Sequence, residues 1–409
     1  MSDLLLLDPA FPDLGAPAFM PHDAERVGAA IADWLLGPAL RLDDGNALLA
    51  GLAERLNAAG LPVDRITIAV DALHSEYAGI GRSWTREDGP RVRFFPHGDA
   101  RMEVYRASPF YHVHRTGEWL VLDLRVEPDE RFGIVAELKE GGHQSYLCIP
   151  IAFTNGTENG ISLASRTPDA FGPRAMTVLR KVVPALAALL EVRTAHKWLD
   201  DVLRIYVGDE PHREILGGSI RRGQVSRIRS AMLFADMRGY TRLSSGLQPE
   251  ETVELLNTFF DCLVPPIEAG GGEVLKYMGD GLLAIFRDRG DDTGGASHAA
   301  LAAAREANAG VEALNRAGVL PGPIGLGVAL HHGEAAYGNV GSGSRLDFTV
   351  IGCDVNLASR IGRLNRVLDE PILMSKAFAD HLWDIPDELG PHAVEGFDEP
   401  VRLYRPRRV

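Results

Sequence analysis

The stretch from Met232 to Phe286 constrains the fold more than any other part of the chain, because it joins two aspartates to a strand, a helix and a hairpin. Apolar residues 232–235 predict a buried strand that ends at Asp236. Residues 249–267 have helical apolar spacing, and residues 273–286 predict two strands around a Met-Gly-Asp-Gly turn that holds Asp280. If these strands are neighbours, the two carboxylates meet at one edge of a sheet. Paired hard oxygen ligands suit Mg²⁺ or Mn²⁺, and two such ions suit phosphoryl or nucleotidyl transfer.

Further apolar runs complete this sheet. Strands are expected at residues 324–330 and 348–351, separated by the glycine-rich stretch 333–343, and helices at residues 297–316 and 353–364. With the first stretch they predict an α+β fold, a ferredoxin-like βαββαβ sheet with its helices on one face.

Three segments of this half resemble the catalytic domain of class III nucleotide cyclases. They are Phe234-Ala-Asp-Met-Arg-Gly-Tyr-Thr241, Lys276-Tyr-Met-Gly-Asp280 and Asp347-Phe-Thr-Val-Ile-Gly-Cys-Asp-Val-Asn-Leu-Ala-Ser-Arg360. Any one of them would be a weak signal, but all three occur in order and on suitable elements. The resemblance covers residues 226–409 and independently implies the same fold.

In cyclases that this sequence resembles, two Mg²⁺ or Mn²⁺ ions bridge the carboxylates that match Asp236 and Asp280. The backbone carbonyl of Met237 would complete the site. One ion activates the ribose 3′-hydroxyl and the other grips the triphosphate. The following turn opens a helix whose free N–H groups would receive phosphate oxygens. Its residues are Arg238, Gly239, Tyr240 and Thr241.

The resemblance also assigns the substrate. Lys276 and Thr349 match the two positions that read the purine, and a lysine with a threonine implies ATP, because guanine-specific relatives carry an acidic residue and typically a cysteine there. Asn356 and Arg360 lie one turn apart on one helix face. They match the residues that orient the ribose and stabilise charge on the α-phosphate.

One position departs from the family pattern. Glu395 precedes Gly396, where relatives often have a lysine that holds the triphosphate. Another cation, such as Arg345 or Lys376, would then have to bind the triphosphate.

Class III sites of this kind are built across a dimer. One chain supplies the aspartate pair, and its partner supplies the two purine readers, the asparagine and the arginine. Since all six are present here, a homodimer would have two complete sites and a monomer none.

The N-terminal half resembles a GAF-type sensor, an α/β domain expected at residues 41–180, with a PAS-like domain as the alternative. The resemblance rests on apolar residues 146–153, an Asn-Gly turn, residues 160–165 and Asp169-Ala-Phe171 before an apolar helix. Residues 1–40 are expected to form an extended arm and a helix. The ligand of this domain is unknown.

Three side chains of this half are candidates for chemistry. His112 and His114, at spacing two, are expected to share one strand face, where two solvated side chains are favoured over a metal or haem site without a third ligand. Cys148 lies in a predicted core strand and is interpreted as a buried small hydrophobe.

A heptad pattern connects the two halves. Apolar residues from Val178 to Tyr206 alternate at spacings of four and three over about four repeats, interrupted by Pro184, so that a regular coil is expected from about Ala185. A parallel dimeric coiled coil within a linker at residues 181–225 is favoured over a helix that is buried against its own domain. His196 falls in this seam and most simply weakens its packing.

Composition limits the partners. The net charge of −14 argues against nucleic acid or an anionic membrane as the main partner. No run approaches a membrane span, and three scattered cysteines suggest a reducing, cytoplasmic location. The leading hypothesis is an adenylate cyclase regulated by its N-terminal sensor. The alternatives are a degenerate, ligand-responsive cyclase fold and a diguanylate cyclase, whose Gly-Gly-acidic-acidic-Phe loop is missing from the hairpin.

Overall fold

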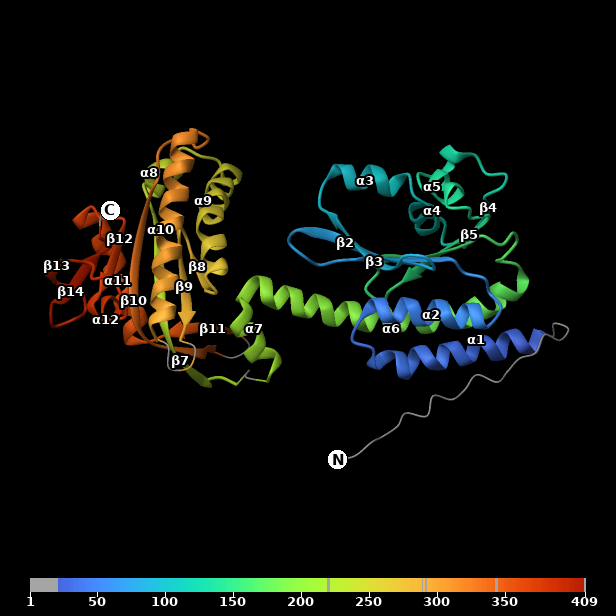
Figure 1. Cartoon of the computed structure of the whole chain (residues 1–409), viewed down its shortest axis with the longest axis horizontal. Helices are drawn as coiled ribbons and strands as arrows, with labels where there is room; N and C mark the ends of the chain where they lie inside the picture. The colour runs from blue at the N-terminus through green and yellow to red at the C-terminus, as the bar shows by residue number, and fades with distance from the viewer. Residues whose placement is uncertain (1–20, 219–220, 289, 291–292, 343–344, 408–409) are drawn as a thin grey trace, which may run out of the picture. The chain divides into compact units, whose positions relative to one another are not determined.

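The computed structural model describes residues 21–218, 221–288, 290, 293–342 and 345–407, in two compact units that divide between Val202 and Leu203 (Figure 1). Most of the predicted N-terminal arm lies outside the described residues. Among the helices that are described, none combines the length and apolarity needed to cross a membrane.

The first unit is built on one antiparallel sheet in the order β3-β2-β1-β6-β5-β4. The apolar segments at residues 146–153 and 160–165, which carried the resemblance to a sensor domain, fall on two of its strands. Its elements are α1 (Pro21–Leu36), η1 (Pro38–Arg41), α2 (Gly45–Ala58), β1 (Arg65–Asp71), β2 (Tyr77–Thr85), β3 (Gly89–Pro96), α3 (Asp99–Arg106), α4 (Pro109–Thr116), β4 (Leu120–Asp123), η2 (Asp129–Arg131), α5 (Val135–Glu140), β5 (Ser145–Ala152), β6 (Glu158–Ser165) and α6 (Pro173–Val207).

Helices cover both faces of this sheet, with α1, α2 and α6 on one face (Figure 1). Successive side chains of a strand point to opposite faces. Leu147 and Ile149 of β5 therefore join the core of these three helices, whereas Cys148 faces a second core that includes Val113 of α4 and Val135 of α5. The interpretation of Cys148 as a buried hydrophobe is confirmed, since its exposure is 0%.

His112 and His114 lie on α4, so the predicted strand was wrong. Ser108 caps this helix by accepting a hydrogen bond from the Tyr111 N–H, and Pro109 occupies the first turn, where proline is well tolerated. These start signals outweigh the alternation that suggested a strand. Nε2 of His114 lies 2.8 Å from the Asn159 carbonyl oxygen, and Nδ1 lies 2.8 Å from the Tyr105 hydroxyl. Its ring is thus committed to internal hydrogen bonds.

Helix α6 runs without a break through Pro184, contrary to the expected interruption. Pro184 is exposed, while its neighbours are buried in the core of the first unit, which holds the helix on both sides of it. The first part of the heptad pattern, from Val178 to Leu189, is also buried there. This part follows the alternative interpretation. Val192, Leu199 and Tyr206, farther along the same pattern, are exposed.

The second unit carries the predicted βαββαβ arrangement. Its elements are α7 (Asp209–Leu216), β7 (Val225–Arg238), α8 (Tyr240–Ser244), α9 (Pro249–Ala269), β8 (Glu273–Met278), β9 (Gly281–Arg287), α10 (Thr293–Ala317), β10 (Gly325–Ser342), β11 (Arg345–Ile351), α11 (Cys353–Leu368), β12 (Ile372–Ser375), α12 (Lys376–Ala379), β13 (Asp387–His392) and β14 (Val401–Arg405). The strand order β10-β7-β9-β8, with α9 and α10 as the two connecting helices, is the expected ferredoxin-like sheet, extended beyond β10 by β12, β14 and β13.

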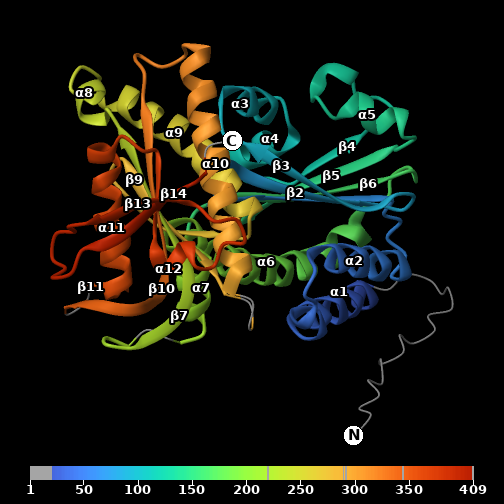
Figure 2. The same ribbon diagram turned by 60° about the vertical axis from the view of Figure 1, so that its left-hand side comes forward.

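The prediction that the helices of this unit lie on one face of the sheet was wrong. Side chains of α9 and α10 pack with Ala235 and Met237 of β7. Helix α11 covers the opposite face, where Ile361 packs near Phe234, and Figure 2 shows α10 and α11 on opposite sides of the strands. A strand buried on both faces has no polar alternation, so its sequence does not reveal the second layer.

Strand β10 passes straight through the glycine-rich stretch that was predicted to separate two strands. It pairs with β7 from Gly325 opposite Arg238 to Gly338 opposite Val225. One glycine serves a close approach, because a Cβ on Gly333 would lie 2.2 Å from Oδ2 of Asp354. Glycine here accommodates a neighbouring side chain and does not end the strand.

Candidate active site

Asp236 and Asp280 are brought together as predicted. Asp236 lies opposite Gly281 of β9, and the Met237 N–H donates to the Asp280 carbonyl oxygen at 3.0 Å. Because Ala235 and Met237 point into the core of α9 and α10, strand alternation turns Asp236 to the other face. The hairpin turn at Gly279, with φ of 66°, places Asp280 beside it.

The electrostatics of this pair suit a cation. Asp236 remains accessible to solvent, but the protein around it removes part of its hydration. This desolvation, followed by the charge of Asp280, raises the pKa of Asp236 to about 6. A divalent ion between the two carboxylates would offset both effects. In the described part of the chain, no group of three or more His, Cys, Asp or Glu side chains is arranged so that it could hold a metal ion. An ion held by this pair would therefore depend on backbone and substrate oxygens as well, as is common for Mg²⁺.

The turn predicted to hold phosphate has a structural arginine. The Arg238 guanidinium donates to the Asn365 carbonyl oxygen at 2.6 Å and to the carbonyl of Glu370, so it fastens the C-terminal end of α11 to β7. Gly239 follows in the left-handed region, with φ of 91°, and α8 begins at Tyr240. Since the Arg238 side chain binds carbonyl groups of its own chain, the predicted phosphate binding would have to come from the backbone N–H groups from Gly239 to Thr241.

Lys276 and Thr349 lie on different strands, β8 and β11. The Lys276 ammonium lies 3.0 Å from the Asp347 carboxylate, and both side chains are about half exposed. Asp347 and Thr349 are two residues apart on β11 and therefore share a face. Lys276 and Asp347 line an open groove of about 1000 Å³, whose wall includes the last turn of α6 at Arg204.

The sequence analysis assigned no role to Asp347. Its spacing of two residues from Thr349 could have indicated that both side chains lie on the same face of one strand.

Asn356 and Arg360 lie on α11, with Asn356 exposed. Glu395, at the position where a lysine had been expected, accepts from Arg360 at 3.1 Å and from Arg363 at 2.6 Å. It thus neutralises the arginine that was predicted to act on the α-phosphate. Sequence reasoning did not include Arg363, which lies three residues after Arg360 on the same helix face.

Lys376, one proposed substitute for the missing lysine, is paired with Asp380.

The two halves of the predicted site stay apart. In the described part of the chain, no hydrogen bond or ion pair joins the aspartate pair to Lys276, Thr349, Asn356 or Arg360. The register agrees, because Asp236 lies opposite Gly327 of β10, whereas Thr349 lies opposite Gly338 near the other end of that strand.

Comparisons with known proteins concern this unit. Residues 225–383 match the adenylate and guanylate cyclase catalytic domain. An adenylate cyclase of Anabaena cylindrica is 33% identical over 201 residues, which are 46% of this chain and 38% of that protein. Adenylate cyclase 1 of Rhizobium meliloti is 32% identical over 156 residues, which are 37% of this chain and 23% of that protein. The chain thus spans well under half the length of these curated relatives.

Among solved structures, the adenylyl cyclase CyaB from P. aeruginosa is 28% identical with a TM-score of 0.41, over 45% of this chain and 98% of that one.

Proposed function

Because residues 225–383 match the adenylate and guanylate cyclase catalytic domain, we propose that the protein is an adenylate cyclase, which converts ATP to 3′,5′-cyclic AMP and pyrophosphate. The observation that carries this proposal is the pair of neighbouring carboxylates, Asp236 and Asp280, at the edge of the sheet.

In this proposal Asp236, Asp280 and the Met237 carbonyl hold two Mg²⁺ or Mn²⁺ ions. When bound, such ions favour ionisation of the ribose 3′-hydroxyl and neutralise triphosphate charge. The raised pKa of Asp236 supports this assignment, since a carboxyl that is costly to ionise alone is stabilised as a carboxylate by a cation.

Lys276 and Thr349 bind the adenine. The ammonium donates to a ring nitrogen, and the threonine hydroxyl accepts from the exocyclic amino group. Asp347, which pairs with Lys276, positions that ammonium. A guanine would leave these polar groups without matching partners, and this makes the pocket selective for ATP.

The bond change is an in-line exchange at the α-phosphorus. The ribose O3′ forms a bond to this phosphorus as the bond to the pyrophosphate oxygen breaks. Asn356 orients the ribose, and the fixed positive charge of Arg360 stabilises charge on the α-phosphate. The backbone N–H groups from Gly239 to Thr241 bind phosphate oxygens.

The complete site forms between two copies of the chain. The separation of Asp236 from Thr349 along β10 in one chain supports this assembly, because both groups must contact one nucleotide. The N-terminal unit acts as a GAF-like sensor, and α6 carries its signal by pairing with α6 of the second copy. The exposed Val192 and Leu199 support that pairing.

The test is an incubation of the full chain with ATP or GTP and Mn²⁺ at high protein concentration, assayed for cyclic nucleotides. Cyclic AMP from ATP is expected. The Asp236→Asn variant should form no product, while its circular dichroism spectrum shows that it is folded like the unaltered protein. Absence of product from both nucleotides contradicts a cyclase, and preference for GTP contradicts the purine assignment.

A second candidate function has one specific observation in its favour. Glu395 neutralises Arg360, which is compatible with a cyclase fold that binds nucleotide without turning it over. Saturable ATP binding without cyclic AMP would support this ligand-responsive module.

A further inference from the structure

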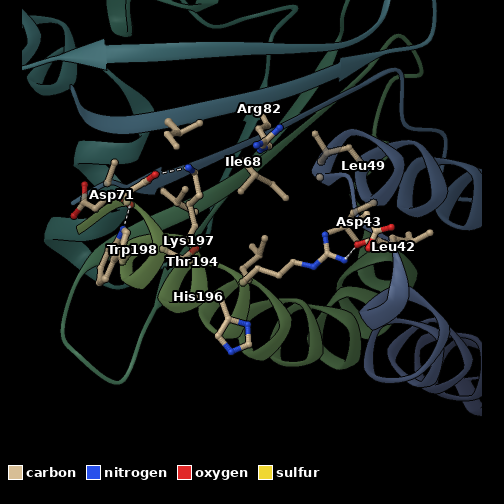
Figure 3. Close-up of a pocket in the computed structure, with 18 of the residues that line it drawn as sticks. Leu42, Asp43, Leu49, Ile68, Asp71, Arg82, Thr194, His196, Lys197 and Trp198 are labelled. Carbon is tan, nitrogen blue, oxygen red and sulfur yellow. Dashed lines mark hydrogen bonds and ion pairs between the residues drawn. The ribbon is translucent and has the colours of Figure 1, made fainter. Parts of the chain in front are cut away.

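A cavity of about 390 Å³ lies within the first unit, between the sheet and helices α2 and α6 (Figure 3). We propose that it binds a small organic carboxylate with an apolar body, the apolar part lying against the sheet and the carboxylate between Arg82 and Arg193. If this unit is the sensor proposed above, the cavity is where its ligand binds.

The apolar part of the lining comes from four elements. Side chains of α2, of β1 and β2, and of α6 form one continuous wall, made of Leu48, Leu49, Ile68, Val70, Ile80 and Leu190. The volume falls in the range of small-molecule sites, and burial of an alkyl group against such a wall contributes about 25 cal/mol per Å². A ligand with an apolar body is therefore favoured over a fully polar ion.

Two guanidinium groups face this cavity without a carboxylate partner. Arg193 is partly buried, and its Nη2 donates to the carbonyls of Ala39 and Leu42. Arg82 has one weak contact, 3.4 Å from Nη1 to the Asn46 amide oxygen. Within the described residues neither arginine forms an ion pair. Desolvation lowers the pKa of Arg193, and the charge of Arg82 lowers it further. An anion placed between the two would relieve both effects.

The other charged side chains of the lining are Asp43, Asp71, Lys197 and Asp201, and none of them forms an ion pair with either arginine. Lys197 and Asp201 neutralise each other on α6. The Asp44 carboxylate caps α2 by accepting from the Asn46 N–H. Asp43 is exposed and lies beyond ion-pair distance of both arginines. The positive charges of Arg82 and Arg193 are thus not neutralised by an ion pair with any described residue, although the charges of Asp43 and Asp44 act against the lowering of the Arg193 pKa.

One further polar group supports a ligand. Thr194 lines the cavity next to Arg193, and only 9% of it is exposed. Its hydroxyl makes no hydrogen bond to any described residue. A carboxylate bound between the guanidinium groups could accept from this hydroxyl, and a planar carboxylate matches the fork of a guanidinium.

The test compares four probes on the full-length protein by isothermal titration calorimetry: octanoate, 1-octanol, octylamine and acetate. Octanoate is expected to bind saturably, at one molecule per chain. The alcohol and the amine have the same tail without the anion, and acetate has the anion without the tail, so each is expected to bind at least about tenfold more weakly.

Arg82→Gln is the variant of choice, because Arg82 has little structural bonding, whereas Arg193 holds the carbonyls of Ala39 and Leu42. It is expected to weaken octanoate binding by about tenfold or more. Arg91→Gln is the matched control. Arg91 is an exposed arginine on the next strand, where it lies opposite Ser83 and thus on the other face of the sheet from Arg82.

Thermal melting of both variants verifies their folding, and Arg82→Lys, which keeps the charge without the fork, is expected to be intermediate. The proposal is overturned if octanoate does not bind, if octanol or octylamine binds equally well, or if Arg82→Gln binds octanoate like the unaltered protein. None of these readouts requires cyclase activity, so the two proposals fail separately.

Discussion

Asp236 and Glu395 show how single side chains set the electrostatics of the candidate active site. At Asp236 the strand geometry brings a second carboxylate close, and the pKa rises to about 6. At Glu395 a carboxylate stands where a cation had been expected and pairs with two arginines of α11. The negative charge of Asp236 is thus raised in energy by its neighbour, whereas that of Glu395 is offset by Arg360 and Arg363.

Glu395→Gln is expected to raise cyclase activity. The substitution removes the charge that pairs with Arg360, whose positive charge then acts fully on the α-phosphate. Since both partners are partly exposed, the gain is modest, about two- to fivefold in kcat/KM. Glu388→Gln, which removes an ion pair with Arg402 on β13 and β14, is the control and should leave activity unchanged. Unchanged or lower activity in Glu395→Gln would mean that Glu395 does not restrain Arg360.

Lys276→Glu combined with Thr349→Cys is expected to shift the enzyme from ATP toward GTP, by about tenfold or more in the ratio of kcat/KM values. The acidic side chain can accept from the guanine N–H groups, which a lysine cannot. Both nucleotides are assayed with the double variant and with Thr349→Cys alone. Retained preference for ATP in the double variant would show that these residues do not read the base.

The three cysteines should react very differently with a thiol reagent at pH 8. Burial raises the pKa of Cys148 to about 12 and also raises the pKa of Cys262 above its usual range. Both thiols therefore stay mainly protonated at pH 8, whereas the thiolate is the reactive form. Cys353 is exposed. One rapid equivalent per native chain is therefore expected, and three after denaturation. Rapid reaction of Cys148 in the native protein would contradict its burial.

At the scale of elements, α6 serves two environments in one continuous helix. Its early apolar residues belong to the core of the first unit, and the same spacing continues beyond that core with exposed side chains. The heptad pattern therefore does not indicate a coiled coil along its whole length, because its first part packs in the core of the first unit.

Leu189→Ala and Leu199→Ala separate these environments. Leu189 is 1% exposed and Leu199 is 51% exposed. Leu189→Ala should lower the free energy of unfolding by about 2–5 kcal/mol. Leu199→Ala should change it by less than about 0.5 kcal/mol, when measured on dilute monomer. Urea unfolding followed by tryptophan fluorescence gives both values, because four of the five tryptophans precede Val202. Equal changes in the free energy of unfolding would contradict a division of α6 into a buried part and an exposed part.

At the scale of the whole molecule, the proposed activity belongs to a pair of chains. One chain places Asp236 and Thr349 toward opposite ends of β10, and strand register keeps them apart. Catalysis would then depend on how two catalytic domains associate, and a sensor can control it by changing their arrangement.

Mixing Asp236→Ala with Asn356→Ala tests the shared site. Each variant alone should be inactive, but after equal mixing half of all dimers would contain both variants, and each of these mixed dimers would have one complete site out of two. Equal mixing is thus expected to restore about a quarter of the unaltered activity. Sedimentation confirms that the variants associate, and an inactive mixture of associated chains would rule out sites built from two copies.

Local patterns predicted much of the fold and the residues of the candidate site. The hairpin around Asp280, the strand that ends at Asp236 and the ferredoxin-like order all follow from apolar periodicity and turn residues. The second helical layer, the passage of β10 through its glycines and the helix around His112 did not, because each depends on packing or capping that overrides the local signal.

By itself, the sequence determined which chemical groups the protein possesses: two aspartates beside glycines, a lysine, a threonine, and an asparagine one turn from an arginine. Such motifs depend on residue type and spacing, which a sequence states directly. The tertiary structure alone decided which of these groups meet. It pairs Lys276 with Asp347 and Arg360 with Glu395, and it encloses Arg82 and Arg193 in one cavity. The reason is physical, because burial and neighbouring charge depend on residues that are distant in the chain and become neighbours only when the sheets form.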